Sequence, residues 1–136
     1  MKKEETLEFL LDFKKLKSVA NCSQDVVPVV VQDAQSLEVL NIAYVDQSAL
    51  DYTLSTGRAA FWSTSRDELW IKGATSGDYL DVAEVSLNCE QNSLVYKVNL
   101  VGKSQCHTQR KSCYYRKIQW NSSQKILEFI DSSSCS

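Results

Sequence analysis

The feature that most constrains the fold is a series of short apolar runs, rich in β-branched residues, along the middle of the chain. The runs "VVPVVVQDA" and "EVLNIAYV" are separated only by the polar "QSL", which predicts a pair of strands. Two further hairpins are predicted where "AAFWSTS" and "ELWIKG" flank Arg66-Asp67, and where "DVAEVSLN" and "SLVYKVNLV" flank "CEQN". We therefore expect short antiparallel strands that form a twisted sheet or a partial barrel.

Two segments have the pattern of helices. Residues 4–17, "EETLEFLLDFKKLK", combine leucines with early acids and late lysines, which predicts an amphipathic helix. Before "QSALDYTLST", Asp46 is a good N-cap, and Gly57 stands where a helix end favours a left-handed residue. Two or three helices among many short strands indicate the α+β class, mostly β.

The whole chain is expected to be one domain of 136 residues, with a core at about 26–118 and frayed ends. Its net charge of −2 gives no reason to expect binding to nucleic acid or to an anionic membrane. The longest apolar run, "VVPVVV", is too short to cross a bilayer, and "MKKEETLEF" is a poor secretory signal. These points favour the cytosol, where cysteines are expected to be reduced, metal-bound or catalytic.

The segment "CHTQRKSC" contains Cys106, Cys113 and the only histidine, His107. Two sulfurs on one zinc lie about 3.8 Å apart, whereas seven positions span roughly 10 Å in a helix and more than 20 Å in a strand. If both cysteines bind one metal, the segment must therefore fold back as a loop. Cys89, at the tip of a predicted hairpin, is a candidate third ligand. The alternative is that the cysteines are small buried side chains and His107 is a surface residue.

Three thiolates around zinc leave one coordination position open, as in catalytic sites. They also more than neutralise the dication, so a bound water is less acidified than at a tris-histidine site. A base beside the metal would then be useful, and His107 is the only imidazole available.

Several segments, in order, resemble one family, the phosphoribosyl-AMP cyclohydrolases, which open the purine ring of their substrate in histidine biosynthesis. The resemblance runs from about Val29 to Arg116. The segments that carry it are "VVQD" at 30–33, "NIAYVDQSAL" at 41–50, "FWSTSRDELWIKGATSG" at 61–77, "NCEQN" at 88–92 and "CHTQRKSCYYR" at 106–116.

The resemblance implies a homodimer in which zinc is bound by Cys89 of one subunit and by Cys106 and Cys113 of the other. It implies hydrolysis of the N1–C6 bond of the adenine ring in 1-(5-phosphoribosyl)-AMP, with His107 transferring the proton. Two alternatives are a divergent relative that acts on another purine-like nucleotide, and a non-catalytic dimer stapled by zinc. His107 argues against the last, because a structural zinc needs no base.

The sequence departs from the family at a motif that usually has three aspartates, which bind magnesium. Those positions are Asn88, Glu90 and Asn92 here. Amide oxygens are neutral and bind Mg²⁺ more weakly than carboxylates, so we expect this site to be weakened, lost, or filled only with substrate phosphate. The alternative is a polar hairpin turn.

The substrate carries two phosphorylated riboses, so cations and hydroxyls are needed to bind them. Arginine suits bidentate contact with phosphate, although any single cation is also explained as a solvated surface charge. Aromatic residues (Trp62, Trp70, Tyr114 and Tyr115) either stack on the base or belong to the core. The candidates for substrate binding are Ser63, Ser65, Arg66, Lys72, Ser76, Arg110 and Arg116.

Overall fold

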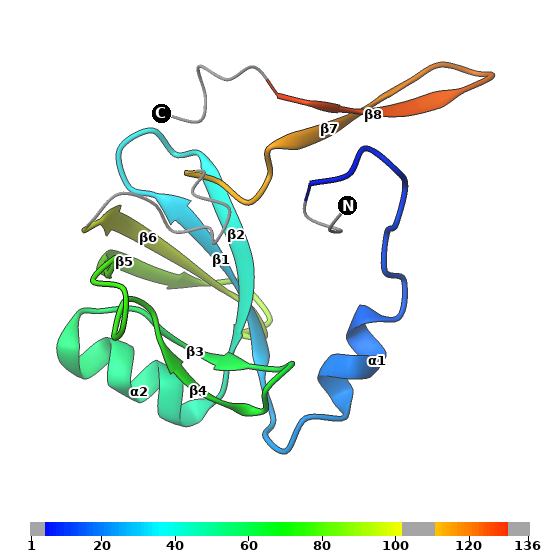
Figure 1. Ribbon diagram of the computed structural model, residues 1–136. Coiled ribbons are helices and arrows are strands. Elements are labelled where there is room, and N and C mark those ends of the chain that lie inside the picture. Colours follow the sequence, from blue (N-terminus) through cyan, green and yellow to red (C-terminus); the bar gives the residue numbers. More distant parts are fainter. Residues whose placement is uncertain (1–4, 102–110, 131–136) are drawn as a thin grey trace.

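In the computed structural model, residues 5–101 and 111–130 are described. They form the α+β arrangement that was predicted, with two helices and eight short strands in this part of the chain (Figure 1). The elements are α1 (Lys15–Ala20), β1 (Val27–Asp33), β2 (Val39–Val45), α2 (Gln47–Thr56), β3 (Ala60–Ser63), β4 (Glu68–Ile71), β5 (Leu80–Leu87), β6 (Leu94–Leu100), β7 (Arg116–Trp120) and β8 (Lys125–Phe129).

The main sheet is open and has the strand order β2-β1-β6-β5. The predicted hairpins β1–β2, β3–β4 and β5–β6 are confirmed as antiparallel pairs. The joint between β1 and β6 is parallel, with Val29 opposite Leu94. This joint was not predicted, because it pairs strands that lie far apart in the sequence. It makes β2 and β5 the two edges of the sheet.

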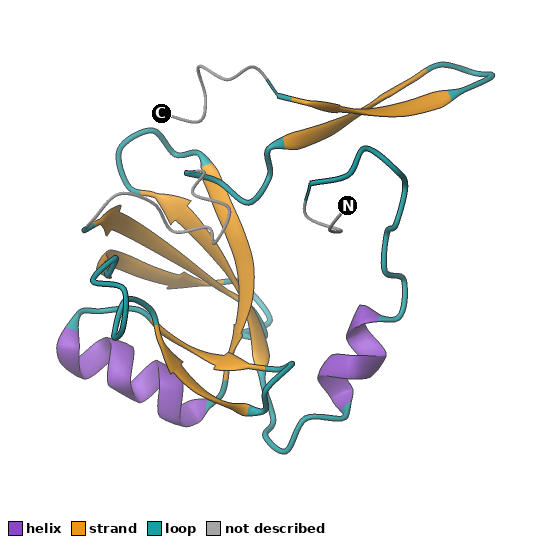
Figure 2. Ribbon diagram, in the orientation of Figure 1, coloured by secondary structure: helices purple, strands orange, loops and turns teal. Residues whose placement is uncertain are grey.

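Helix α2 and the β3–β4 hairpin pack against the sheet (Figure 2). The carboxylate of Asp46 accepts a hydrogen bond from the Ala49 N–H at 2.9 Å, and Gly57 has φ +76°, so both predicted ends of this helix are confirmed. Inside it, the Thr53 hydroxyl accepts from the Ala60 N–H at 2.9 Å, which ties α2 to β3. The largest fully buried side chains are Val29, Val31, Leu40, Val45, Thr53, Leu80, Tyr96 and Val98.

The helix predicted over 4–17 is wrong, because residues 5–14 are not helical and α1 begins at Lys15. The Asp12 carboxylate accepts a hydrogen bond from the Lys14 N–H at 3.0 Å, which favours a turn at this point. Leu11 and Phe13 remain 68% and 89% exposed. Without a packed apolar face, a short helix gains too little to offset its ordering.

The β7–β8 hairpin was not predicted from the sequence. It stands away from the main sheet, on the side where the N-terminal segment lies (Figure 1). Among residues 5–101 and 111–130, no helix has the length and apolar character that crossing a bilayer requires.

Candidate active site

Cys89 is exposed in the turn that joins β5 to β6. The side-chain oxygen of Asn88 accepts from the Asn92 and Ser93 N–H groups at 2.9 and 3.0 Å, while its amide donates to the Asn92 side chain at 2.6 Å. The Asn92 amide also donates to the Glu90 carboxylate at 3.2 Å. These contacts are those of a well-ordered polar turn that presents Cys89. Magnesium binding by the three side chains stays a prediction.

Cys113 is half-buried beside the outer edge of β2. Its N–H donates to the Leu40 carbonyl at 2.8 Å, and the Ser112 hydroxyl donates to the Val39 carbonyl at 2.9 Å. The same hydroxyl accepts from the Tyr114 N–H at 2.9 Å. These hydrogen bonds fix Cys113 against the start of β2. Burial, together with the Cys113 thiol, raises the pKa of the neighbouring Tyr114 phenol.

Lys111 adds a second anchor for this segment. Its ammonium lies 3.6 Å from the Asp33 carboxylate and 3.6 Å from that of Glu38, at the β1–β2 turn. Burial acts to raise the pKa of Asp33, but hydrogen bonds from Ser36 and the charge of Lys111 outweigh it and hold that pKa below its usual value. Lys111 thus serves to hold the chain just before Cys113.

The two described candidate ligands lie at opposite corners of the main sheet. Cys89 follows β5, one edge strand, at the end where Leu94 pairs with Val29. Cys113 lies along β2, the other edge strand, at the opposite end. At about 4.8 Å per strand across the sheet and 3.3 Å per residue along it, they are on the order of 20 Å apart. One copy of the chain does not bring these two sulfurs to one zinc.

The remaining predicted residues of this site, Cys106, His107 and Arg110, lie outside the described residues. Within residues 5–101 and 111–130, no three His, Cys, Asp or Glu side chains come together as a metal site.

A groove of about 760 Å³ lies beside Cys113. Two cations line it, Lys15 from α1 and Arg116 from β7. The Arg116 guanidinium donates to the Thr6 carbonyl at 2.7 Å, and the Lys15 ammonium donates to the Thr64 hydroxyl at 3.4 Å. Cys113 and Arg116, one of the predicted substrate-binding residues, therefore line the same groove. The other residues that line it are Glu8, Phe9, Leu10, Leu11, Asp12, Tyr114, Ile118 and Leu127.

Lys15 was not among the candidates from the sequence. It stands in "DFKKLK", where a run of lysines was explained by the helix dipole alone. Its contact with Thr64 spans 49 positions of sequence, so no local pattern points to it.

Five of the predicted substrate residues belong to residues 63–77, here called the predicted phosphate-binding stretch, which includes the β3–β4 loop and the turn that follows β4. The Ser63 hydroxyl accepts from the Arg66 N–H at 3.3 Å and lies 3.5 Å from that of Ser65. The exposed Arg66 guanidinium is 3.5 Å from the Glu68 carboxylate. Ser76 accepts from a neighbouring backbone N–H in the later turn. These residues are ordered by local contacts.

The lysine-glycine turn after β4 has a strict steric requirement. Gly73 has φ +90°, and a Cβ at this position would lie 2.5 Å from the Tyr79 backbone nitrogen. Lys72, just before it, is buried. A residue other than glycine would displace this turn and the lysine beside it.

Three of the four candidate stacking residues have structural contacts. The Trp62 indole donates to Asp67 at 3.0 Å, Trp70 packs on Phe61, and Tyr115 stacks on a β8 phenylalanine. Tyr114 is the one that lines the groove.

Comparison with known proteins gives matches over most of the chain. The phosphoribosyl-AMP cyclohydrolase family model matches residues 41–115, which contain both described candidate ligands, Cys89 and Cys113. A phosphoribosyl-AMP cyclohydrolase of Hyphomonas neptunium is 44% identical over 93 residues, covering 68% of this chain and 70% of the relative. The enzyme of Clostridium botulinum is 41% identical over 105 residues, 77% of this chain and 88% of the relative. That of Desulfotalea psychrophila is 40% identical over 92 residues, 68% of this chain and 72% of the relative.

The α+β fold and these matches define the class of protein: the chain is a hydrolase that acts on C–N bonds. The chain belongs to the phosphoribosyl-AMP cyclohydrolase family.

Proposed function

We propose that this chain is a zinc-dependent enzyme that hydrolyses the N1–C6 bond of the adenine ring in 1-(5-phosphoribosyl)-AMP, a step of histidine biosynthesis. The observation that carries the proposal is the family match over 41–115, because this range contains every residue of the proposed metal site. The three cysteines and His107 all fall inside it. A cytosolic location and the absence of a nucleic-acid partner stay predictions.

Cys89, Cys106 and Cys113 would bind the zinc, since thiolates are ligands that zinc prefers. The separation of Cys89 from Cys113 in one copy supports a homodimer in which each site takes Cys89 from one subunit and the other two cysteines from its partner. When bound, the zinc supplies Lewis-acid activation of water.

His107 would take the proton of the attacking water and return it during ring opening. The substrate is suited to this attack, because substitution at N1 makes the ring cationic and C6 more electrophilic. The groove beside Cys113 offers Tyr114 to the base and two cations, Lys15 and Arg116, to the phosphates.

Magnesium is proposed to be dispensable for this enzyme. The side-chain oxygens of Asn88 and Asn92 already accept hydrogen bonds within the turn, and amides are weaker ligands than carboxylates. The replacement of the family's three aspartates by Asn88, Glu90 and Asn92 also favours the second candidate, a family member with a different purine-like substrate.

The experiment supplies purified protein with 1-(5-phosphoribosyl)-AMP and follows the gain of one water by mass spectrometry. We expect turnover that chelation abolishes, that zinc restores and that magnesium does not change. Cys113→Ser should lose both zinc and activity. Cys22→Ser is the matched control, because the Cys22 thiol donates locally to the Gln24 carbonyl, far from all three proposed ligands in the sequence.

Two outcomes would contradict the proposal. If zinc-loaded protein leaves this substrate intact, the result favours the second candidate, a family member that acts on another purine-like nucleotide. Unchanged zinc content in Cys113→Ser would refute the ligand set.

A further inference from the structure

The N-terminal segment forms one side of the groove beside Cys113. We define the N-terminal strap as residues 5–14, which precede α1 and are not helical. Five consecutive residues of the strap, 8–12, line the groove, and all of them lie outside the segment 41–115 that matches the family model. This chain therefore builds part of its candidate site from residues that the family match does not include.

The strap is attached to the rest of the described chain at both ends. Near its start, Thr6 is buried, and its carbonyl accepts a hydrogen bond from the Arg116 guanidinium at 2.7 Å. Just after its end, the Lys15 ammonium donates to the Thr64 hydroxyl at 3.4 Å. Figure 1 shows the strap running from α1 toward β7, the strand that begins with Arg116. These contacts hold the strap along the groove.

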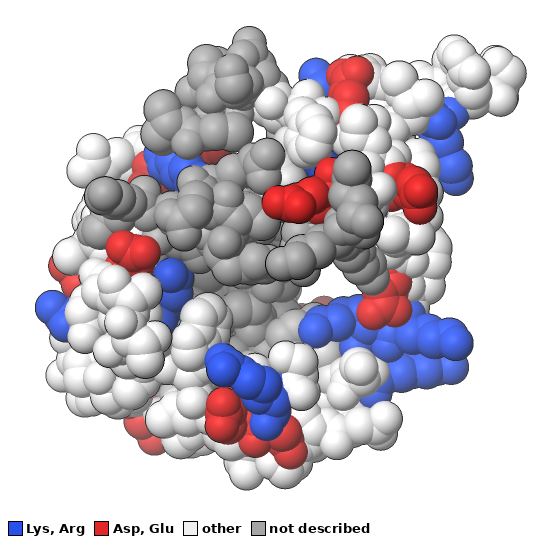
Figure 3. Space-filling view, viewed as in Figure 1, with Lys and Arg blue, Asp and Glu red and all other residues white. Residues whose placement is uncertain are grey.

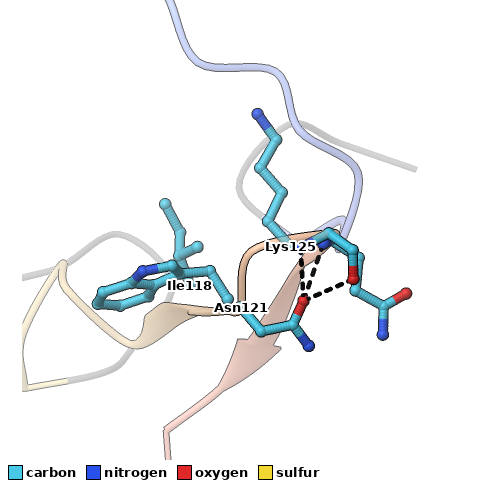
Figure 4. Close-up of a pocket in the computed structure, with 6 residues that line it drawn as sticks. Ile118, Asn121 and Lys125 are labelled. Atoms are coloured by element: carbon cyan, nitrogen blue, oxygen red, sulfur yellow. Dashed lines mark hydrogen bonds between the residues drawn. The ribbon is translucent and has the colours of Figure 1, made fainter.

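The β7–β8 hairpin contacts the strap through Lys125. The Lys125 ammonium lies 5.1 Å from the centre of the Phe9 ring, a cation–π contact that fixes the ring beside the hairpin. Lys125 follows a well-ordered turn (Figure 4). In this turn the side-chain oxygen of Asn121 accepts from the Ser123 N–H at 2.9 Å and from the Gln124 N–H at 3.0 Å. Phe9 is thus an aromatic ring with a defined position that is still 39% exposed.

The side chains that line the groove match the parts of a purine nucleotide. Two aromatic rings line it, Phe9 from the strap and Tyr114 from the segment after Cys113. Two cations line it as well, and Figure 3 shows basic side chains gathered over α1, which carries one of them. The carboxylates of Glu8 and Asp12 are acceptors for ribose hydroxyls. The groove therefore offers contacts to a base, to phosphate and to ribose.

The base is the part of the substrate that suits Phe9. Nucleobases have a flat π-face that stacks on aromatic side chains, and the exposed part of the Phe9 ring gains burial when a base covers it. The strap itself buries little, because Thr6 is the one buried residue within 5–14. A segment with so few buried contacts opens at low cost, so a ligand that covers Phe9 would also order the strap.

We propose that Phe9 is a specificity-determining residue that stacks on the purine base, and that the N-terminal strap closes the groove around this base. The ligand is the substrate of the proposed reaction, so this step rests on the proposed function. Phe9 and Tyr114 contact the base from two distant segments, while Lys15 and Arg116 meet the phosphates. The strap is loosely held without ligand and becomes ordered when the base covers Phe9.

The test is the affinity of metal-free protein for AMP and for ribose 5-phosphate, which lacks the base, measured by isothermal titration calorimetry. We expect Phe9→Ala to weaken AMP binding about 10-fold and to leave ribose 5-phosphate binding unchanged, because the lost ring contacts only the base. Phe9→Tyr keeps an aromatic face and should retain the affinity for AMP. Phe13→Ala is the matched control, since Phe13 lies in the same strap but is not among the residues that line the groove. Its affinity for AMP should equal that of wild type.

Hydrogen exchange gives a second readout, because AMP should slow the exchange of backbone N–H groups in residues 5–14 of wild type. A wild type that does not bind AMP, or a Phe9→Ala variant that binds it equally well, would overturn the proposal. Equal losses for both probes would also overturn it, since they would assign Phe9 a structural role. Neither readout uses turnover. Phe9-dependent AMP binding without hydrolysis of 1-(5-phosphoribosyl)-AMP refutes only the proposed reaction, and hydrolysis with Phe9-independent AMP binding refutes only the role of the strap.

Discussion

Lys15 joins two parts of the candidate site that the sequence keeps apart. Its ammonium donates to Thr64 in the predicted phosphate-binding stretch and lines the groove beside Cys113. The ammonium also lies 6.0 Å from the centre of the Tyr44 ring, and under the proposed function it would meet an anionic ligand in the groove. A phosphate group of the substrate is such a ligand.

Replacing this charge should therefore affect substrate binding more than chemistry. We expect Lys15→Met to raise KM for 1-(5-phosphoribosyl)-AMP roughly 10-fold and to change kcat less than about 2-fold, because the contact is equal in ground and transition states. Steady-state kinetics with zinc-loaded protein measure both values. Lys17→Met, on the same helix but outside the lining of the groove, should leave KM unchanged. Equal KM values for the two variants would remove Lys15 from the site.

At the scale of elements, the segment 111–114 depends on the turn between β1 and β2. The Lys111 ammonium pairs with Asp33 and Glu38, while backbone contacts to β2 hold Cys113. The pKa of Asp33 is lowered in the folded protein, so this carboxylate stabilises the fold fully above its unfolded pKa, and the contribution is lost as pH falls through the lower folded value.

The pair should therefore have a pH-dependent effect on stability. We expect Lys111→Met to lower the free energy of unfolding by about 1 kcal/mol at pH 7, and by clearly less at a second, acidic pH at which Asp33 is protonated. Chemical denaturation at the two pH values measures this difference. Lys97→Met is the control, because its pairing with the exposed Glu84 is worth only a few tenths of a kcal/mol. An equal loss at both pH values would assign the effect to the apolar stem of Lys111.

The elements that could be predicted from sequence are those fixed by neighbouring residues. Asp46 and Gly57 mark both ends of α2, and each predicted hairpin is bounded by its own polar turn. The parallel pairing of β1 with β6 brings together segments that are distant in the sequence, so no local pattern predicts it. The helix predicted over 4–17 failed because its apolar periodicity is not matched by burial, and Leu11 and Phe13 stay 68% and 89% exposed.

The candidate site shows the same division. Residue types predict Cys89 and Cys113 as ligands of a soft metal, since thiolates suit zinc whatever the fold. Their placement at opposite corners of the sheet follows only from the strand order. The groove and Lys15 were missed because they depend on the N-terminal segment lying beside β7, a contact between opposite ends of the chain.

At the scale of the whole molecule, the strand order gives the proposed site a symmetry requirement. Cys89 follows one edge strand and Cys113 lies along the other, so under the proposed function a single chain would carry two separate half-sites. In a closed two-fold dimer these halves meet as two equivalent sites. Damage to one half-site in one subunit should then leave the other site of the dimer intact.

Subunit mixing tests this arrangement directly. Cys89→Ser and Cys113→Ser should each be inactive alone, but refolding them together should restore about a quarter of wild-type activity, because half of the dimers are hybrids and each hybrid has one intact site of two. Activity after zinc loading is measured on a mixture whose hybrid content is confirmed by mass spectrometry. Mixing Cys113→Ser with Cys106→Ser is the matched control. These two cysteines are proposed to come from the same subunit, so no hybrid contains a complete set of ligands and the mixture should stay inactive. Recovery in the control, or inactive Cys89→Ser and Cys113→Ser hybrids, would mean that the ligands are divided between subunits in another way.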